Sequence, residues 1–166
     1  MVMNTTMSSR NAVGTRIAPR TTTTVAVVLP AYNEEVTIEA CIRDFHAALP
    51  EAEIWVINNR SSDATEAIAR ATLCAINSAG GVINEPRPGK GNAVRRAFLE
   101  IDADIYLLCD ADQTYPARRA RDLLAPIIAG DADMVVGDRH SAGHYASENK
   151  RAWHGFGNRL VRSLVN

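Results

Sequence analysis

Short apolar runs alternate with segments of helical periodicity along most of this chain, and this alternation limits its fold more than any other feature. Each run has the length of a β-strand, and the runs cover residues 25–29, 54–57, 81–83, 105–109 and 134–136. Between the first two runs, apolar residues recur every three or four positions, and Pro50 ends that pattern. Strands separated by such helices are joined by right-handed crossovers. The sequence therefore predicts an α/β fold with a mostly parallel sheet and helices on both faces.

Three further helices are expected between and after the later runs. One begins at Asp63, which stands three residues before Glu66 in the arrangement of a capping box. The next shows its apolar face over residues 94–101, and the fourth covers residues 118–128 with Pro126 near its end. A last helix is expected over residues 153–165.

The composition is that of one ordinary globular domain, because 46% of the 166 residues are hydrophobic and 22% are charged. Residues 1–22 carry three arginines among Ser, Thr and Met and contain no acid. We expect them to form a disordered tail, with a transit peptide as the alternative, and residues 23–166 to form the domain.

Charge and cysteine content exclude several classes of protein. A net charge of −1, from 18 basic and 19 acidic residues, leaves no basic surface for nucleic acid. The 3 cysteines lack CxxC spacing and indicate neither a disulfide framework nor a zinc site. No apolar stretch approaches the roughly 18 to 20 residues of a membrane span. The prediction is a cytoplasmic protein.

Polar clusters follow the predicted strands, at residues 30–34, 58–59, 110–112 and 137–139. Ligands of a parallel sheet bind at these carboxyl ends. Asp110 and Asp112 come directly after an apolar run, where two negative side chains need a positive partner. We interpret Asp112 as a ligand of Mg²⁺ or Mn²⁺ bound together with a nucleotide diphosphate, and Asp110 as a contact to the ribose or to a water beside the metal. A turn with two solvated acids is the alternative.

Gly89-Lys90-Gly91-Asn92 stands at the start of the third predicted helix. It offers backbone N–H groups, a helix N-terminus and an ammonium group, all of which suit a phosphate. A helix start with a solvated lysine is the alternative. The spacing is not that of a Walker loop, and no glycine turn follows the first strand, so ATPase and dinucleotide-binding functions are not supported.

Four motifs, in this order, resemble those of family 2 glycosyltransferases, which have the Rossmann-like, nucleotide-sugar-binding GT-A fold. They are VVLPAYNEE at residues 27–35, NNRSSD at 58–63, PGKGNA at 88–93 and DAD at 110–112. Within the family, the chain looks most like enzymes that transfer a sugar to a polyprenyl phosphate, such as dolichyl-phosphate mannose or glucose synthases. The resemblance implies a hexosyltransferase that uses a GDP- or UDP-sugar with Mg²⁺ or Mn²⁺.

The resemblance also implies roles for individual residues. Asp110 and Asp112 would bind the metal, and Asp112 and Arg139 would be catalytic, with Arg139 facing the diphosphate or the acceptor. The residues implied in substrate binding are Pro30, Ala31, Tyr32, Glu34, Asn58, Lys90, Asp110 and Ala111.

Two departures from the family pattern stand out. The family's acidic DDGS after the second strand is replaced here by Asn58-Asn59-Arg60-Ser61, which keeps hydrogen-bonding capacity, loses charge and leaves the preferred base open. Relatives also continue with an acceptor-side segment. We therefore expect a C-terminally truncated chain whose donor-binding part is present and whose acceptor part is incomplete.

The implied acceptor, a polyprenyl phosphate, agrees with the chemistry of the site. A hydroxyl acceptor needs a general base, for which no residue is placed, whereas a phosphate is already an anion. The resemblance implies one inverting displacement, and such an acceptor would place the protein peripherally on the cytoplasmic membrane face. Two alternatives stay open. A sugar-phosphate nucleotidylyltransferase should show a glycine-rich loop after the first strand, where Tyr32-Asn33-Glu34 stands instead. A non-catalytic nucleotide-sugar-binding fragment is favoured by Asn58-Asn59.

Overall fold

The computed structural model describes residues 2–4 and 23–137. The chain divides into two compact units, Met1–Val136 and Gly137–Asn166, and all described residues except Gly137 belong to the first. The domain predicted over residues 23–166 spans this division. Arg139 and the helix expected over residues 153–165 lie outside the described residues.

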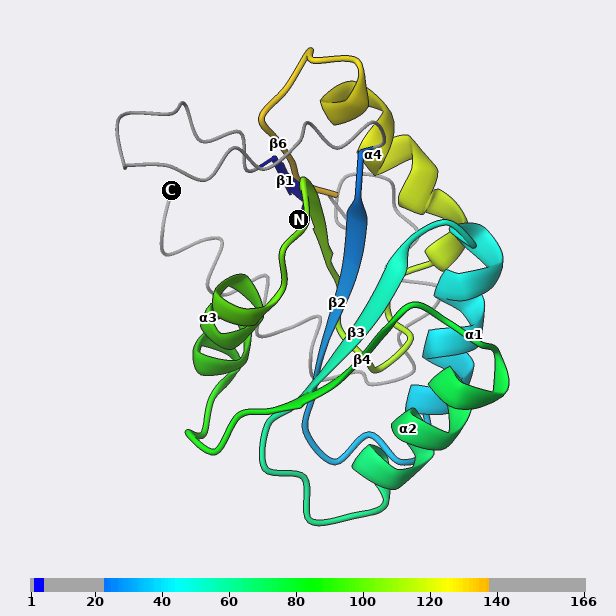
Figure 1. Ribbon diagram of the computed structural model, residues 1–166, viewed down its shortest axis with the longest axis vertical. Helices are drawn as coiled ribbons and strands as arrows, with labels where there is room; N and C mark the ends of the chain where they lie inside the picture. Colours follow the sequence, from blue (N-terminus) through cyan, green and yellow to red (C-terminus); the bar gives the residue numbers. More distant parts are fainter. Residues whose placement is uncertain (1, 5–22, 138–166) are drawn as a thin grey trace, which may run out of the picture. The chain divides into compact units, whose positions relative to one another are not determined.

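Six strands of the described part of the chain form one sheet, in the order β4-β3-β2-β5-β1-β6 (Figure 1). They are β1 (Val2–Asn4), β2 (Val25–Ala31), β3 (Glu53–Asn58), β4 (Gly80–Asn84), β5 (Ile105–Leu108) and β6 (Met134–Val135). Strands β2, β3, β4 and β5 are parallel, whereas β1 is antiparallel to both of its neighbours. Each of the five predicted apolar runs coincides with one of these strands, so the mostly parallel α/β sheet is confirmed.

Strand β1 departs from the disordered tail that the sequence predicts over residues 1–22. Its central residue Met3 pairs with Tyr106 of β5 on one side and with Met134 of β6 on the other. Three residues are too few to show the alternation by which a strand is detected in a sequence. This strand is defined by its neighbours in the sheet, not by its own pattern.

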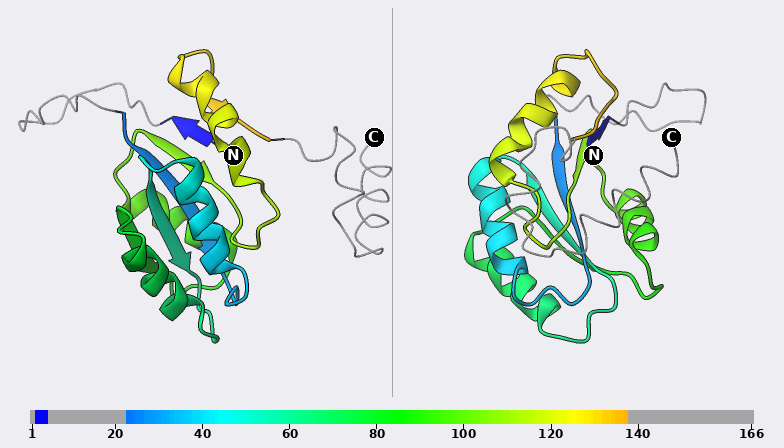
Figure 2. Two further views of the ribbon diagram at one scale, coloured as in Figure 1. Left: turned by 90° about the vertical axis from the view of Figure 1, so that its right-hand side faces the viewer. Right: turned by 180° about the vertical axis from the view of Figure 1, so that it is seen from behind.

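Helices cover both faces of the sheet, as predicted. Figure 2 shows α1 (Ile38–Ala48), α2 (Thr65–Ala75) and α4 (Ala120–Ile128) on one face and α3 (Lys90–Glu100) on the other. A short 3₁₀ helix, Ala117–Arg119, leads into α4. Among the described residues, no helix combines the length and apolar character needed to span a membrane.

The side chains of β2 alternate between two hydrophobic cores. Val27 and Leu29 pack in the core beneath α1, α2 and α4, whereas Ala26 and Val28 pack against α3 beside Ala97. These four β2 side chains are all fully buried. A strand covered on both faces has no solvent-facing position, which explains the uninterrupted apolar run at residues 25–29.

The start of α2 differs from the predicted capping box. The helix begins at Thr65, and Asp63 accepts a hydrogen bond from the Thr65 N–H at 3.0 Å. Glu66 does not close a reciprocal bond to Asp63, because its carboxylate accepts hydrogen bonds from Asn58, Asn84 and Arg70. The Glu66 carboxylate, which would complete a capping box, is instead hydrogen-bonded to Asn58 and Asn84 at the ends of two strands.

Candidate functional site

Strands β2, β3, β4 and β5 all end at the same edge of the sheet. Their register places Ala31, Asn58 and Asn84 side by side at the ends of β2, β3 and β4. On the other side of β2, β5 ends at Leu108, two residues before Asp110. The structure therefore brings the polar clusters that follow β2, β3 and β5 to one edge, as parallel strands require.

The turn after β2 is fastened to the loop after β3. Asn33 has a left-handed φ of 56°, its N–H donates to Ser61 Oγ at 3.0 Å, and its Oδ1 accepts from the Ser62 N–H at 2.8 Å. The N–H of Glu34 donates to Thr65 Oγ1 at 2.8 Å. Asparagine tolerates this conformation better than most residues. The turn is thereby held in one shape at the edge.

The predicted binding residues of this turn are exposed to different extents. Tyr32 is 62% exposed, Pro30 and Glu34 are half-buried, and Ala31 is buried. The Glu34 carboxylate accepts a hydrogen bond from Thr37 Oγ1 at 2.9 Å. Ala31 can offer a ligand only its backbone, whereas the aromatic face of Tyr32 is open to contact.

Asn58 is buried, and its side chain joins a polar network with half-buried and exposed partners. Its Nδ2 donates to Asn84 Oδ1 at 2.8 Å and to Glu66 Oε2 at 3.2 Å, and its Oδ1 accepts from the Ser61 N–H at 3.2 Å. Hydrogen bonds from Asn84 and Arg70 lower the pKa of Glu66, so the acceptor stays ionised. Both amide hydrogens of Asn58 are used within the protein. Its predicted contact with the base or ribose stays a prediction.

Asn59, the next residue, fastens the loop that leads from β4 to α3. Its Oδ1 accepts from the Gly89 N–H at 2.7 Å, and its Nδ2 donates to the carbonyls of Arg87 at 2.6 Å and Glu85 at 3.1 Å. Asn59 is only 5% exposed. Sequence reasoning assigned no role to its side chain, because its partners stand about 30 positions away along the chain.

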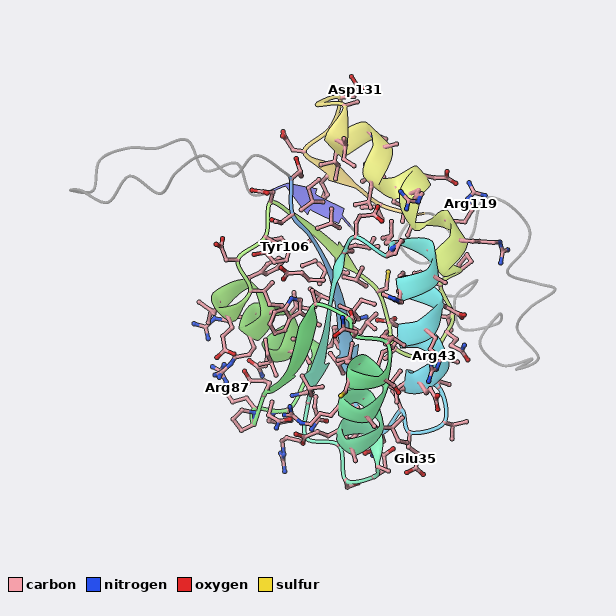
Figure 3. The ribbon with its side chains drawn as sticks, turned by 45° about the vertical axis from the view of Figure 1, so that its right-hand side comes forward. Glu35, Arg43, Arg87, Tyr106, Arg119 and Asp131 are labelled. Carbon is pink, nitrogen blue, oxygen red and sulfur yellow. The ribbon has the colours of Figure 1, made fainter. Side chains whose placement is uncertain are left out.

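Glu85 and Arg87 brace the same loop and were not predicted either. The Glu85 carboxylate is fully buried and accepts from Nε and Nη2 of Arg87, both at 2.9 Å. The side chain and backbone N–H of Arg87 lower the pKa of Glu85 to about 2. Figure 3 shows Arg87 on the side of the molecule where α3 begins. The sequence held one signal for Glu85, which is an acid directly after strand β4.

Lys90 and Asp110 form an ion pair across the edge of the sheet. Lys90 is the first residue of α3, and Asp110 lies just past the end of β5. Both side chains keep access to solvent, 62% for Lys90 and 29% for Asp110. The structure thus joins two separately predicted motifs, the GKGN segment and the DAD segment.

Burial alternates along the DAD segment, which follows β5. Cys109 and Ala111 are buried in the core, whereas Asp110 is half-buried and Asp112 is exposed. Asp112 Oδ1 accepts from the N–H and the Oγ1 of Thr114, at 3.0 and 2.7 Å. Its other carboxylate oxygen makes no hydrogen bond to a described residue. The middle residue of the motif anchors the segment, and the two acids flank it.

The donor set at this edge fits a hard divalent cation. Asp110 and Asp112 could supply carboxylate oxygens, which Mg²⁺ and Mn²⁺ prefer. Within residues 2–4 and 23–137, no group of three or more His, Cys, Asp or Glu side chains is gathered to hold a metal. Two carboxylates leave coordination positions for diphosphate oxygens and water, as is usual for Mg²⁺ with a nucleotide.

A family model described as glycosyl transferase family 2 matches residues 26–164, which is most of the sequence. The chain belongs to glycosyl transferase family 2. Protein RfbJ of Shigella flexneri is 41% identical over 119 residues, which cover 72% of this chain and 88% of RfbJ. The low-salt glycan biosynthesis hexosyltransferase Agl6 of Haloferax volcanii is 36% identical over 120 residues, but the match covers only 27% of Agl6.

Solved structures confirm the GT-A fold predicted for this family 2 chain. Glucosyl-3-phosphoglycerate synthase of Mycobacterium tuberculosis, in complex with Mn²⁺, UDP-glucose and phosphoglyceric acid, matches with a TM-score of 0.54 and 30% identity. The match covers 66% of this chain and 40% of that one. The mannosyltransferase PcManGT of Pyrobaculum calidifontis, in complex with GDP-Man and Mn²⁺, matches with a TM-score of 0.53 and 27% identity over 58% of this chain and 30% of its own. The chain spans less than half the length of these two enzymes.

Proposed function

We propose that this protein transfers a sugar from a nucleotide-diphosphate sugar to a polyprenyl phosphate, in a reaction that needs Mg²⁺ or Mn²⁺. The observation that carries the proposal is the ion pair between Lys90 and Asp110 at the carboxyl edge of the sheet, two residues before Asp112. Relatives with this fold hold Mn²⁺ with UDP-glucose or GDP-Man, which supports a nucleotide sugar as the donor.

The residues at this edge have complementary roles in the proposed reaction. Asp110 and Asp112 would hold the cation, which when bound would stabilise negative charge on the departing diphosphate. Lys90 presents its ammonium group together with the first N–H groups of α3, an arrangement that favours phosphate oxygens. Tyr32, 62% exposed beside this edge, offers a flat surface for the base.

The acids at this edge favour a phosphate over a hydroxyl group as the acceptor. A hydroxyl acceptor needs a general base, but Asp110 and Asp112 are assigned to the cation in this proposal, and the Glu34 carboxylate accepts a bond from Thr37. A phosphate attacks as an anion and needs no such group. A single displacement would invert the anomeric carbon, and Arg139 is proposed to face the diphosphate or the acceptor.

Calorimetric titration with UDP, GDP and their sugars, with and without Mn²⁺, tests the donor half of the proposal. We expect one base to bind only with Mn²⁺, and Asp112→Asn to weaken that binding by about tenfold or more. Asp131→Asn is the matched control, because Asp131 lies at the opposite end of the molecule from Glu35 (Figure 3). Failure of every nucleotide to bind, or binding indifferent to Mn²⁺ and to Asp112→Asn, would contradict the proposal.

Transfer assays then test the acceptor. The nucleotide sugar that binds is supplied with a polyprenyl phosphate or with the matching polyprenyl alcohol, and the glycolipid product is measured. We expect product from the phosphate only. Product from the alcohol would refute the acceptor argument while leaving the donor site intact. Binding without any transfer would instead favour a non-catalytic nucleotide-sugar-binding protein, for which the closed network around Asn58 is the supporting observation.

A further inference from the structure

One buried side chain, Asn59, satisfies three backbone groups of the loop that precedes α3. The Gly89 N–H donates to its Oδ1, and its Nδ2 donates to the carbonyls of Glu85 and Arg87. Its own N–H donates to the Ala31 carbonyl at 2.9 Å, which fixes the residue to the end of β2. One asparagine therefore connects the ends of β2 and β3 to the loop between β4 and α3.

Other bonds hold the first part of this loop, where the Arg87 N–H donates to Glu85 Oε1 at 2.8 Å, but the N–H of Gly89, next to Lys90, donates to Asn59. Pro86 and Pro88 have no N–H, and Gly89, the N-cap of α3, has φ 111° and ψ 138°, a conformation available essentially to glycine alone. The next residue is Lys90, whose ammonium group pairs with Asp110. The position of Lys90 thus depends on a turn whose shape Asn59 holds.

Asn59 has no amide hydrogen left to donate to a ligand, and its side chain is buried. It is 5% exposed, and both amide hydrogens and the carbonyl oxygen are engaged at 3.1 Å or less. Donating a hydrogen bond to a nucleotide would require breaking one of the bonds from its amide to the loop. Any effect of Asn59 on ligand binding must therefore pass through the loop that it holds.

We propose that Asn59 is a positioning residue: through the 85–89 loop it places Lys90 opposite Asp110 and so sets the affinity for the nucleotide diphosphate. The proposal rests on the function proposed above, and it gives a specific use to an asparagine that replaces an acid of the family pattern. An aspartate at this position would keep the acceptor for the Gly89 N–H, but it would set a negative oxygen against two carbonyls.

The test compares Asn59→Asp with Asn77→Asp, the same chemical change at an exposed asparagine just after α2. Binding of UDP and of GDP, each with Mn²⁺, is measured by calorimetry for both variants. Each is also measured in combination with Lys90→Met. We expect Asn59→Asp to weaken binding by about tenfold in the wild-type background and by less than about twofold beside Lys90→Met. Asn77→Asp should change neither value.

The coupling to Lys90 distinguishes positioning from general damage. An equal loss in both backgrounds, or no loss in either, would overturn the positioning role while the donor site stands. If the wild-type protein binds neither nucleotide, the proposed function itself fails, and the positioning role fails with it.

Gly89→Ala perturbs the same turn through its backbone and serves as a second variant if Asn59→Asp does not fold. An added Cβ at residue 89 meets no atom closer than Asn92 Nδ2 at 4.0 Å, so its effect comes from the backbone alone. It too should weaken binding in the wild-type background and not beside Lys90→Met. Equal losses in the two backgrounds would contradict the proposal here as well.

Discussion

Two glycines with nearly the same backbone conformation should respond very differently to alanine. Gly80 and Gly89 have φ values of 109° and 111°, which residues with a side chain rarely adopt. At Gly89 the added Cβ has only Asn92 Nδ2 nearby, at 4.0 Å. At Gly80 it would lie 2.2 Å from the backbone oxygen of Ile54 and 2.8 Å from its backbone carbon and nitrogen.

Alanine would be strained by the positive φ at both Gly80 and Gly89, but only at Gly80 would it also clash with Ile54. Holding alanine at such a φ costs about 1–3 kcal/mol, of which roughly 0.4–1 kcal/mol is recovered because alanine has fewer unfolded conformations. Gly89→Ala should therefore lower the free energy of unfolding by about 1–2 kcal/mol. Gly80 pairs with Ile54 of β3, so its Cβ must force the two strands apart and disturb ladder hydrogen bonds of about 0.5–1.5 kcal/mol each. Gly80→Ala should lose about 3–5 kcal/mol.

Urea unfolding followed by far-UV circular dichroism measures both variants, with Gly91→Ala as the control. Gly91 lies in the first turn of α3 with no atom within 4 Å of an added Cβ, so alanine there should be neutral or stabilise by up to about 1 kcal/mol. Losses for Gly80→Ala and Gly89→Ala that agree within about 0.5 kcal/mol would refute the argument, because the clash with Ile54 would then have no measurable effect.

Two further predictions concern titratable groups. Because hydrogen bonds from Arg87 hold the pKa of Glu85 at about 2 in the folded protein, below its ordinary 4.5, ionised Glu85 stabilises the fold above about pH 4.5. This stability is lost as the pH falls from 4.5 towards 2, so Glu85→Gln should flatten the pH dependence of the urea midpoint in that window; an unchanged slope would contradict the pairing. Burial raises the pKa of the Cys41 thiol to about 12 and that of Cys109 to about 11, whereas Cys74 is exposed. A thiol reagent at pH 8 should therefore modify one cysteine rapidly in the native protein and all three only in denaturant, and two fast thiols would contradict the burial.

Features of the fold that depend on local sequence were predictable. The run at residues 25–29 is apolar throughout because β2 is covered on both faces, and the same reasoning holds for residues 54–57 in β3. Once these strands are parallel, their carboxyl ends must share one edge, so the gathering of polar clusters follows from topology alone. That is why the sequence suffices to locate the edge that carries Asp110 and Lys90.

Features that depend on contacts between distant segments were not predictable. Residues 2–4 form β1 only because β5 and β6 lie on either side of them. The capping box at Asp63 failed because Asn84, brought close by the pairing of β3 with β4, competes for the Glu66 carboxylate. In both cases the residues that determine the local structure lie far away along the chain, so no local sequence pattern indicates them.

The site combines both kinds of information. After β5, Ala111 is buried and is flanked by the more exposed Asp110 and Asp112. This arrangement could be predicted from the local sequence. The position of Lys90 opposite Asp110 is proposed to depend on Asn59, whose bonds to the loop before α3 come from tertiary structure. A chain that kept the DAD motif but lost this asparagine would still show the family signature, yet its lysine would no longer be held across from the acids. The motif identifies the family, and the buried loop contacts decide whether the motif can work.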